Sequence, residues 1–525
     1  MKNWKSKIII VIFLFLFSFP SIFSLLSPGF FQTDDGEWMA IRFSAFHQAF
    51  RDGQIPVRFL DRLNNGFGYP VANFLYPGFM YLGEPIHFLG FNFVNTIKII
   101  FGLSMISSAF FTYLWLSKFF NKSSAFIGSL FYLYTPYHLF DLYKRGSIGE
   151  VLSLAVIPFV FWQIERKSFL WISLGIFFLI LSHNTLALLF IPLIFLYFLI
   201  SQKGNLKFFL FSNWLPIIFG VFLSAFFWLP AIFELSYVRF SNVLVSDFKQ
   251  YFAPLELIGL STIIVLSFST FFLYGVLTSF SFKNWAKLNA EKIFVLMLFI
   301  SFLSIFFSSK ISFSLWNYIP FSFIQFPFRL LSYLPLSLSF LCAFIIFKLE
   351  GKKQIIAYFV LFSVLVLSSL PYFKPAEFFD KNDSSYATNE GTTTVKNEYM
   401  PKWVKQNPTE HFKNKVEFEE GKGEINNLFY DSKKISFDVV SPEISSITVN
   451  IIYYPGWKAY INNKETSINF NNEKGLISLS MPKGESSVVL TLSETPLRLF
   501  ADIISILSFI SLIIFNKFFY NKIKS

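Results

Sequence analysis

The sequence predicts a mainly α-helical, polytopic membrane protein with a β-rich domain inserted before its last helix. Hydrophobic residues make up 54% of the 525 residues and charged residues only 14%, which is more apolar surface than a soluble protein of this length could cover. About twelve apolar runs are long enough to cross a bilayer. One long polar segment near the C-terminus alternates as β-strands do.

The apolar runs divide the chain into a helical part and an inserted domain. A bilayer core of roughly 30 Å needs about twenty mostly apolar residues per helix. Runs that reach or approach this length lie near 8–26, 95–117, 123–141, 148–164, 168–182, 184–201, 208–232, 257–280, 292–308, 329–347, 354–371 and 497–515. Residues 1–371 are therefore expected to form the transmembrane domain, 372–496 the β-rich domain, and 497–525 the last helix and a tail.

The charges between these runs predict an orientation. With the N-terminus in the cytoplasm, the short basic segments all lie inside, as the positive-inside rule requires. They hold Lys2, Lys5, Lys7, Lys118, Lys122, Arg166, Lys167, Lys203, Lys207, Lys283, Lys287, Lys292, Lys348, Lys352, Lys353, Lys517, Lys522 and Lys524. Both termini are then cytoplasmic and the β-rich domain is extracytoplasmic.

The first run could also be interpreted as a signal peptide. It is long for one, and no A-x-A-like cleavage site follows it, so we expect a retained helix. With either interpretation Asp34 and Asp35 lie outside.

Two outside segments are too long to be simple connectors. In the first, about 27–94, residues 38–51 read WMAIRFSAFHQAFR, whose helical apolar spacing predicts a helix lying in the membrane interface. Residues 74–82 (FLYPGFMYL) are short and contain proline, so we expect an interfacial or re-entrant segment. In the second, 372–496, strands are predicted at 435–440, 447–454, 457–461, 475–480 and 488–492. This pattern predicts a β-sandwich or jelly-roll-like domain.

Composition excludes several kinds of site. The single cysteine, Cys342, excludes an intramolecular disulfide and a zinc site built on clustered cysteines. The five histidines show no metal-ligand spacing, so we predict neither zinc nor a nucleotide cofactor. The net charge of +12 is explained by the basic inner segments, so no nucleic acid partner is expected.

Charged and polar residues beside the outer ends of the spans are the candidates for chemistry, because charge at a membrane is costly. Four clusters qualify: Asp34, Asp35 and Glu37 with Arg42; Lys144, Arg145 and Glu150; His183 and Asn184; and Gln325 with Arg329. Each cluster alone has an ordinary interpretation, since interfacial acids are commonly just hydrated and basic side chains extend to headgroups. All four are predicted on the same face, where helical bundles build sites.

These residue types suit a lipid-phosphate-linked sugar. Arginine and lysine would bind the phosphate, and a carboxylate could act as general base for an acceptor hydroxyl. Alternatively, Asp35 and Asp34 could bind a divalent cation, Mg²⁺ or Mn²⁺, that neutralises the leaving phosphate. Both roles stay open at this point.

The same segments carry a resemblance to a known family. The runs DGQIPVRF (52–59) and GFGYPVANFLYP (66–77) resemble the first-loop signature of bacterial "6-pyruvoyl-tetrahydropterin synthase-related" membrane proteins, which are similar to YfhO-type and GT-C glycosyltransferase-like proteins. Further matches follow in order at KRGSIGE (144–150), LSHN (181–184), QFPFRL (325–330), EYMPKW (398–403) and YYPGWKAY (453–460).

The resemblance implies a GT-C-like bundle whose first outside loop carries the key acid, Asp35. The chain departs from that pattern where relatives have a histidine shortly after the acid, because Trp38 and Met39 stand there. The expected substrate-binding residues are Arg42, Arg58, Lys144, Arg145, Glu150, His183, Asn184, Gln325 and Arg329.

We therefore predict an inverting glycosyltransferase of the bacterial cytoplasmic membrane. It would move a sugar from a polyprenyl-phosphate donor to an envelope glycan acceptor outside the cell, with Asp35 as base or metal ligand and Asp34 assisting. The alternative is a non-catalytic envelope assembly or glycan-binding protein. A lipid-linked oligosaccharide transporter fits less well, because it needs a charged pathway to the inner face and the ionisable residues of the spans are few.

Overall fold

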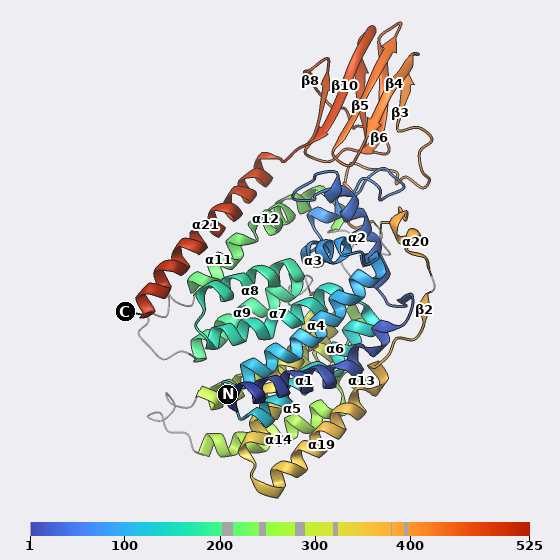
Figure 1. Cartoon of the computed structure of the whole chain (residues 1–525). Helices are drawn as coiled ribbons and strands as arrows, with labels where there is room; N and C mark the ends of the chain where they lie inside the picture. The colour runs from blue at the N-terminus through green and yellow to red at the C-terminus, as the bar shows by residue number, and fades with distance from the viewer. Residues whose placement is uncertain are drawn as a thin grey trace.

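Apolar helices form the bulk of the molecule, below a small β-rich part (Figure 1). The computed structural model describes the whole chain except residues 1, 202–213, 241–247, 279–288, 319–323, 380, 393–396 and 525. Four of the lysines used to predict the orientation, Lys203, Lys207, Lys283 and Lys287, lie outside the described residues.

Within the described residues, eight helical stretches are long and apolar enough to cross a membrane. They correspond to α1 (Lys2–Ile22) with the following turn, α4 (Phe93–Leu116), α7 (Ile148–Glu165), α9 (Asn184–Ser201), α16 (Asn289–Ser308), α18 (Tyr333–Lys348), α19 (Gly351–Ser369) and α21 (Pro496–Lys524). A ninth span results if α11 (Leu215–Leu223) and α12 (Ala225–Glu234), which bend by 68°, are counted as one.

The other expected spans are helical but shorter or broken. They are α5 (Lys122–Tyr134) followed by α6 (Pro136–Phe140), α8 (Phe169–Ser182) and α14 (Leu260–Thr278). Pro136 separates α5 from α6, because proline disfavours the helical conformation in the residue before it. The structure thus supports a mainly helical membrane protein. Among the described residues eight or nine spans meet the length criterion, so the expected twelve are not confirmed.

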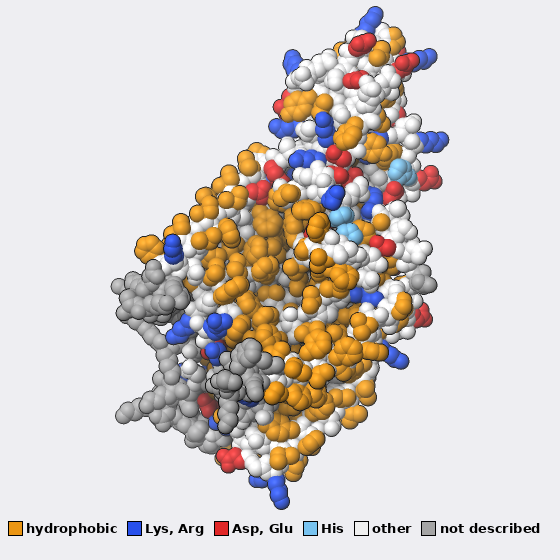
Figure 2. All heavy atoms as spheres, in the orientation of Figure 1, with side chains coloured by type: hydrophobic (Ala, Val, Ile, Leu, Met, Phe, Trp, Pro, Cys, Tyr) orange, Lys and Arg blue, Asp and Glu red, His pale blue; other side chains and the backbone are white. Residues whose placement is uncertain are grey.

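The bundle is built around α18, whose residues are almost all buried. Helix α5 lies against it, and Gly128 permits this approach, since a Cβ there would stand 2.7 Å from the Ser339 carbonyl oxygen. Helices α1, α19 and α21 instead expose apolar side chains. Figure 2 shows hydrophobic side chains over the helical part and charged ones gathered around the sheets, as expected when lipid is the solvent of the helices.

The first long loop, about residues 27–94, packs under the C-terminal part of the chain. Its strand β1 (Phe30–Phe31) pairs antiparallel with β2 (Phe378–Phe379), and α20 (Asp383–Ala387) lies on α2 (Gly36–Arg51). Helix α2, expected in the membrane interface, has most of its residues buried within the protein. The segment expected to be interfacial or re-entrant leads into α3 (Gly78–Phe88), which packs on α2, α4 and α8.

The β-rich part contains two antiparallel sheets. One has the order β4-β5-β10-β7-β8 and the other β3-β6-β9. Their bounds are β3 (Val416–Glu420), β4 (Glu424–Tyr430), β5 (Lys434–Ser441), β6 (Ser445–Ile452), β7 (Trp457–Ile461), β8 (Lys464–Thr466), β9 (Leu476–Met481) and β10 (Gly484–Leu492). The five strands predicted from sequence are present, and β3, β4 and β8 were not predicted. Trp457 belongs to the core, where it contacts Phe59 of the first loop.

Candidate functional site

The acidic turn of the first loop is fixed to the segment between α6 and α7 by backbone hydrogen bonds. Asp34 N donates to Lys144 O over 3.1 Å, and Asp35 N donates to Arg145 O over 2.8 Å. Gly146 allows this contact, because its φ is +62° and a Cβ there would overlap the Thr33 side chain. Two of the clusters singled out in the sequence therefore meet.

Asp35 precedes α2, yet its carboxylate does not cap the helix. An aspartate at this position usually accepts a hydrogen bond from the first turn, and here no such side-chain bond forms. The carboxylate faces Arg145 instead, with Oδ2 3.6 Å from Nη2, and the side chain is 41% exposed. Asp35 is thus held in place by its backbone while its carboxylate stays accessible.

Glu150 is the centre of a buried ionic cluster. Its carboxylate is fully buried and contacts Arg145, Arg329 Nε at 2.8 Å and His183 Nε2 at 3.8 Å. Tyr137 of α6 donates a further hydrogen bond of 2.9 Å to Oε2. The clusters at 144–150, 183 and 325–329 are therefore brought together around one carboxylate.

The two arginines of this cluster are closely partnered. Arg145 also pairs with Asp141 at 2.9 Å, and Arg329 donates to Ile324 O at 2.7 Å and to Gln325 Oε1 at 3.0 Å. Both guanidinium groups lie over the Phe326 ring, at 5.6 and 5.0 Å. Both guanidinium groups therefore already have carboxyl partners within the protein.

Arg42 is the contrasting case. It is buried, but its contacts are loose: Nη2 lies 3.5 Å from Thr392 O and 3.9 Å from Glu398 Oε1. Among the described residues its Nε has no hydrogen-bond partner. A buried guanidinium without close acceptors is costly, so Arg42 is suited to receive an anionic group.

Glu398 is a component that the sequence analysis did not select. It arrives from the segment before the sheets, and burial raises its pKa, while Arg42 lowers the pKa and Asp35 raises it further. The run EYMPKW was noted only as a family match. Nothing local in that run indicates that its glutamate reaches Arg42, which is far away in the sequence.

Asp34 and Lys144 lie at the outer edge of the site. Partial burial raises the pKa of Asp34, the nearby Lys144 lowers it, and Asp35 raises it again. Lys144 is exposed. Glu37, the third acid of the turn, pairs with Lys381 away from this edge.

His183 and Asn184 hold the first loop on the turn between α8 and α9. Asn184 Nδ2 donates to Phe74 O over 3.2 Å, and the His183 ring lies 4.7 Å from the Tyr76 ring. These contacts place both residues beneath the site as supports.

Arg58 has other partners. Its guanidinium contacts Glu494 and Asp502, each at 3.1 Å, and donates to Phe226 O at 2.7 Å. This cluster ties the first loop to α12 and to α21, and it does not include Asp35 or Glu150.

The expected divalent cation has few ligands in the protein. Within the described part of the chain, no group of three or more His, Cys, Asp or Glu side chains converges as metal ligands would. Asp34 and Asp35 alone would supply carboxylate oxygens, and the positive charges of Lys144 and Arg145 lie beside them. Such an ion would need phosphate oxygens of a substrate as further ligands, as is usual for Mg²⁺.

Comparisons with known proteins give a family match. The model of a family described as "6-pyruvoyl-tetrahydropterin synthase related domain; membrane protein" matches residues 75–376. A protein of Lactococcus lactis subsp. cremoris (strain MG1363), described as uncharacterized, is 26% identical over 323 residues, which is 55% of this chain and 51% of the relative. The chain therefore spans about half the length of that relative.

Two solved structures show a distant similarity. The arabinofuranosyltransferase AftD from Mycobacteria matches 73% of this chain and 28% of its own, with 14% identity and a TM-score of 0.48. The oligosaccharyltransferase AglB from Archaeoglobus fulgidus, solved with an inhibitory peptide and a dolichol-phosphate, matches 75% of this chain and 57% of its own, with 10% identity and a TM-score of 0.40.

Proposed function

The chain belongs to the 6-pyruvoyl-tetrahydropterin synthase-related family of membrane proteins, and from that premise we propose that it is an integral-membrane glycosyltransferase. It moves a sugar from a polyprenyl-phosphate donor to a cell-envelope acceptor at the outer face of the bacterial cytoplasmic membrane. The pterin in the family name is not taken as an activity.

One observation carries this proposal: an accessible carboxylate stands against a rigid, buried ionic cluster. Asp35 is 41% exposed and does not cap its helix, while Glu150 beside it has no exposed side-chain surface. A general base must be reachable by its substrate and fixed in position. Asp35 meets both conditions, and Arg145 orients it from the buried side.

The phosphate of the donor is assigned to Arg42 and Lys144. Arg42 is buried, its Nε has no hydrogen-bond partner among the described residues, and its other contacts are long. Lys144 is exposed beside Asp34, whereas Arg145 and Arg329 are already paired with carboxylates. A phosphate at Arg42 would replace the loose contact with Glu398 by a charge-assisted hydrogen bond. Glu150, His183, Asn184 and Gln325 then act as supports.

The transfer step follows from these positions. Asp35 takes the proton of the acceptor hydroxyl as its oxygen forms a bond to the anomeric carbon, with inversion at that carbon. The bond from this carbon to the phosphate oxygen breaks, and the electron pair leaves with polyprenyl phosphate, whose negative charge Arg42 and Lys144 stabilise. A divalent cation held by Asp34, Asp35 and the phosphate would supply further stabilisation of that charge.

The proposal predicts that Asp35→Asn abolishes transfer, because the amide cannot accept the proton. A deletion strain complemented with either wild type or the variant is compared by mass spectrometry of polyprenyl-phosphate sugars and envelope glycans. The variant should accumulate a lipid-linked sugar and lack that sugar in one envelope polymer.

The matched control is Glu37→Gln, which removes a charge from the same turn but leaves the site intact. It should behave as wild type. Normal pools with Asp35→Asn, at normal protein abundance, would reject the transferase and favour a non-catalytic assembly or glycan-binding protein. Unchanged transfer in the presence of EDTA would remove the cation from the proposal and leave the base in place.

A further inference from the structure

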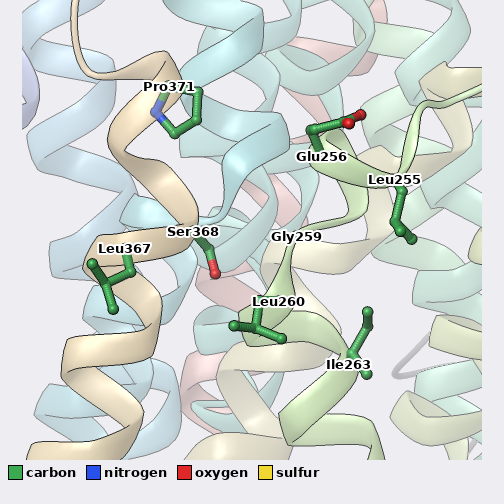
Figure 3. A pocket seen from close by; sticks show the side chains of 8 residues that line it. All are labelled: Leu255, Glu256, Gly259, Leu260, Ile263, Leu367, Ser368 and Pro371. Carbon is green, nitrogen blue, oxygen red and sulfur yellow. The ribbon is translucent and has the colours of Figure 1, made fainter.

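A cavity opens between the outer ends of α14 and α19, away from the ionic cluster. Its volume is ≈ 330 Å³. Figure 3 shows Leu260 and Ile263 on one side and Leu367, Ser368 and Pro371 on the other. Helix α13 (Leu255–Ile258) closes the outer end.

The wall of this cavity presents mainly apolar atoms to an occupant. The Ser368 hydroxyl accepts from Ser261 N at 2.8 Å and donates to Val364 O at 2.8 Å, so its hydrogen bonds are used within the wall. In Figure 3 the Glu256 carboxylate points away from Ser368 and Leu367. The cavity therefore suits a hydrocarbon chain and offers nothing to a charged group.

The helices around the cavity are those expected to contact lipid. Leu260 and Leu367 are 54% and 61% exposed, and further along the same helices Phe271 and Phe359 are 75% and 71% exposed. An occupant of the cavity can therefore enter sideways from the membrane, as the chain of a lipid would.

A row of aromatic rings joins this cavity to the candidate site. Tyr372 follows the cavity residue Pro371, and its ring lies 5.8 Å from that of Phe140. Phe140 lies 5.7 Å from Phe328, and the Arg145 guanidinium lies 5.4 Å from the Phe328 ring. A chain of ring contacts thus leads from the edge of the cavity to the residue that orients Asp35.

We propose that this cavity binds the isoprenoid chain of the donor, in isoprene units beyond the first two, which lie along the row of rings between the phosphate and the cavity. The proposal rests on the proposed function, since it is the cationic site at Arg42 and Lys144 that selects a phosphate-linked lipid. The chain gains little from the hydrophobic effect, because bilayer and cavity are both apolar. It gains contacts in an otherwise unfilled space and holds the sugar-phosphate in position for reaction.

The test fills the cavity and compares donors of two lengths. In Leu260→Trp and Ile263→Trp, KM for an undecaprenyl-phosphate-linked sugar should rise about tenfold, equivalent to about 1.4 kcal/mol. KM for a geranyl-linked donor, whose two isoprene units end before the cavity, should change less than about twofold. The control is Ile10→Trp, which fills a second cavity of ≈ 410 Å³ lined by α1, α5 and Tyr358 of α19 and should change neither KM.

A binding readout separates this proposal from the proposed function. Undecaprenyl phosphate carrying a diazirine in its third or fourth isoprene unit should label peptides of α14 or α19, and Leu260→Trp should reduce that labelling. This result supports the cavity even if Asp35→Asn proves active. Equal rises in KM for both donors, no selective effect of the tryptophans, or equal labelling by a diazirine phospholipid would each overturn the assignment.

Discussion

The carboxylate of Glu150 stabilises the buried ionic cluster. Two arginines, a tyrosine and a histidine converge on its buried carboxylate. Glu150→Gln would leave both guanidinium groups with too little negative charge, and breaking a buried pair by removing one partner costs about 3–5 kcal/mol. We expect a clear drop in the thermal unfolding midpoint in detergent and loss of transfer together.

The control for Glu150 is an exposed pair. Glu465 lies 3.9 Å from Lys458, with both side chains about half exposed, and such surface pairs contribute about 0–1 kcal/mol. Glu465→Gln should leave the midpoint nearly unchanged. A midpoint for Glu150→Gln equal to that of Glu465→Gln would show that the cluster does not stabilise the fold.

The residues that sequence could select share one property: they are charged or polar next to a predicted span. This property singled out Asp35, Arg145, Glu150 and Arg329. In the structure Arg145 and Arg329 both contact Glu150 in the buried ionic cluster, and Asp35 lies beside Arg145. The same reasoning could not tell that Arg145 and Arg329 are closely paired with carboxyl groups while Arg42 has only a loose contact with Glu398. It also missed Glu398, because pairing between distant segments leaves no local pattern.

At the scale of elements, the apolar runs in the sequence predicted where the helices lie but did not predict where a helix is interrupted. Each predicted span contains helix, but Ser224 interrupts one at a 68° bend, and a serine among apolar residues is not a break signal in itself. Strands β3 and β4 were not predicted because they lack a clear alternation of buried and exposed residues. Strand β4 is almost entirely exposed, so it has no buried face to produce alternation.

One buried ion pair fixes the last helix to the bundle. Arg498 of α21 donates to Glu234 of α12 through Nε at 2.8 Å and Nη2 at 2.7 Å, and Tyr454 and Asn73 also donate to Glu234. Arg498→Leu should destabilise the protein by about 3–5 kcal/mol, because Glu234 is left buried and uncompensated. The double variant Arg498→Leu with Glu234→Leu should recover part of the loss.

The measurement is a double-mutant cycle on the unfolding midpoint, together with limited proteolysis of the link between β10 and α21. Arg498→Leu should expose that link to cleavage, and the double variant should protect it again. Additive effects of the two substitutions would contradict a direct stabilising pair.

At the scale of the whole molecule, the first loop joins the sheets to the membrane part. Gln54 Nε2 donates to Ser432 O at 2.8 Å, Ile452 N to Phe67 O at 2.7 Å, and Tyr399 N to the Tyr69 hydroxyl at 2.9 Å. The β-rich part is therefore seated on the loop that carries Asp35. A change in the position of the β-rich part on this loop would therefore shift α2 and, with it, Asp35.

Asp61 makes this seating depend on pH. Burial raises the pKa of Asp61 to about 6, Lys415 opposes the rise, and Asp52 adds to it. Lys415 comes from the approach to β3, and its ammonium donates to Gly66 O at 3.2 Å and Asn450 O at 3.0 Å. Among the described residues, Asp61 Oδ1 is buried without a hydrogen-bond partner.

The direction of the effect follows from proton binding. Below pH about 4, Asp61 is protonated in the folded and unfolded states; between about 4 and 6 the unfolded state releases the proton while the folded state keeps it. The folded state then binds more protons, so the free energy of unfolding falls as pH rises, by up to about 3 kcal/mol at neutral pH.

Asp61→Asn should remove this loss, raising the unfolding midpoint at pH 7 and leaving it nearly unchanged at pH 4. Glu485→Gln on the exposed start of β10 should shift neither value. A midpoint that falls equally from pH 4 to 7 in wild type and in Asp61→Asn would assign the pH dependence to other groups.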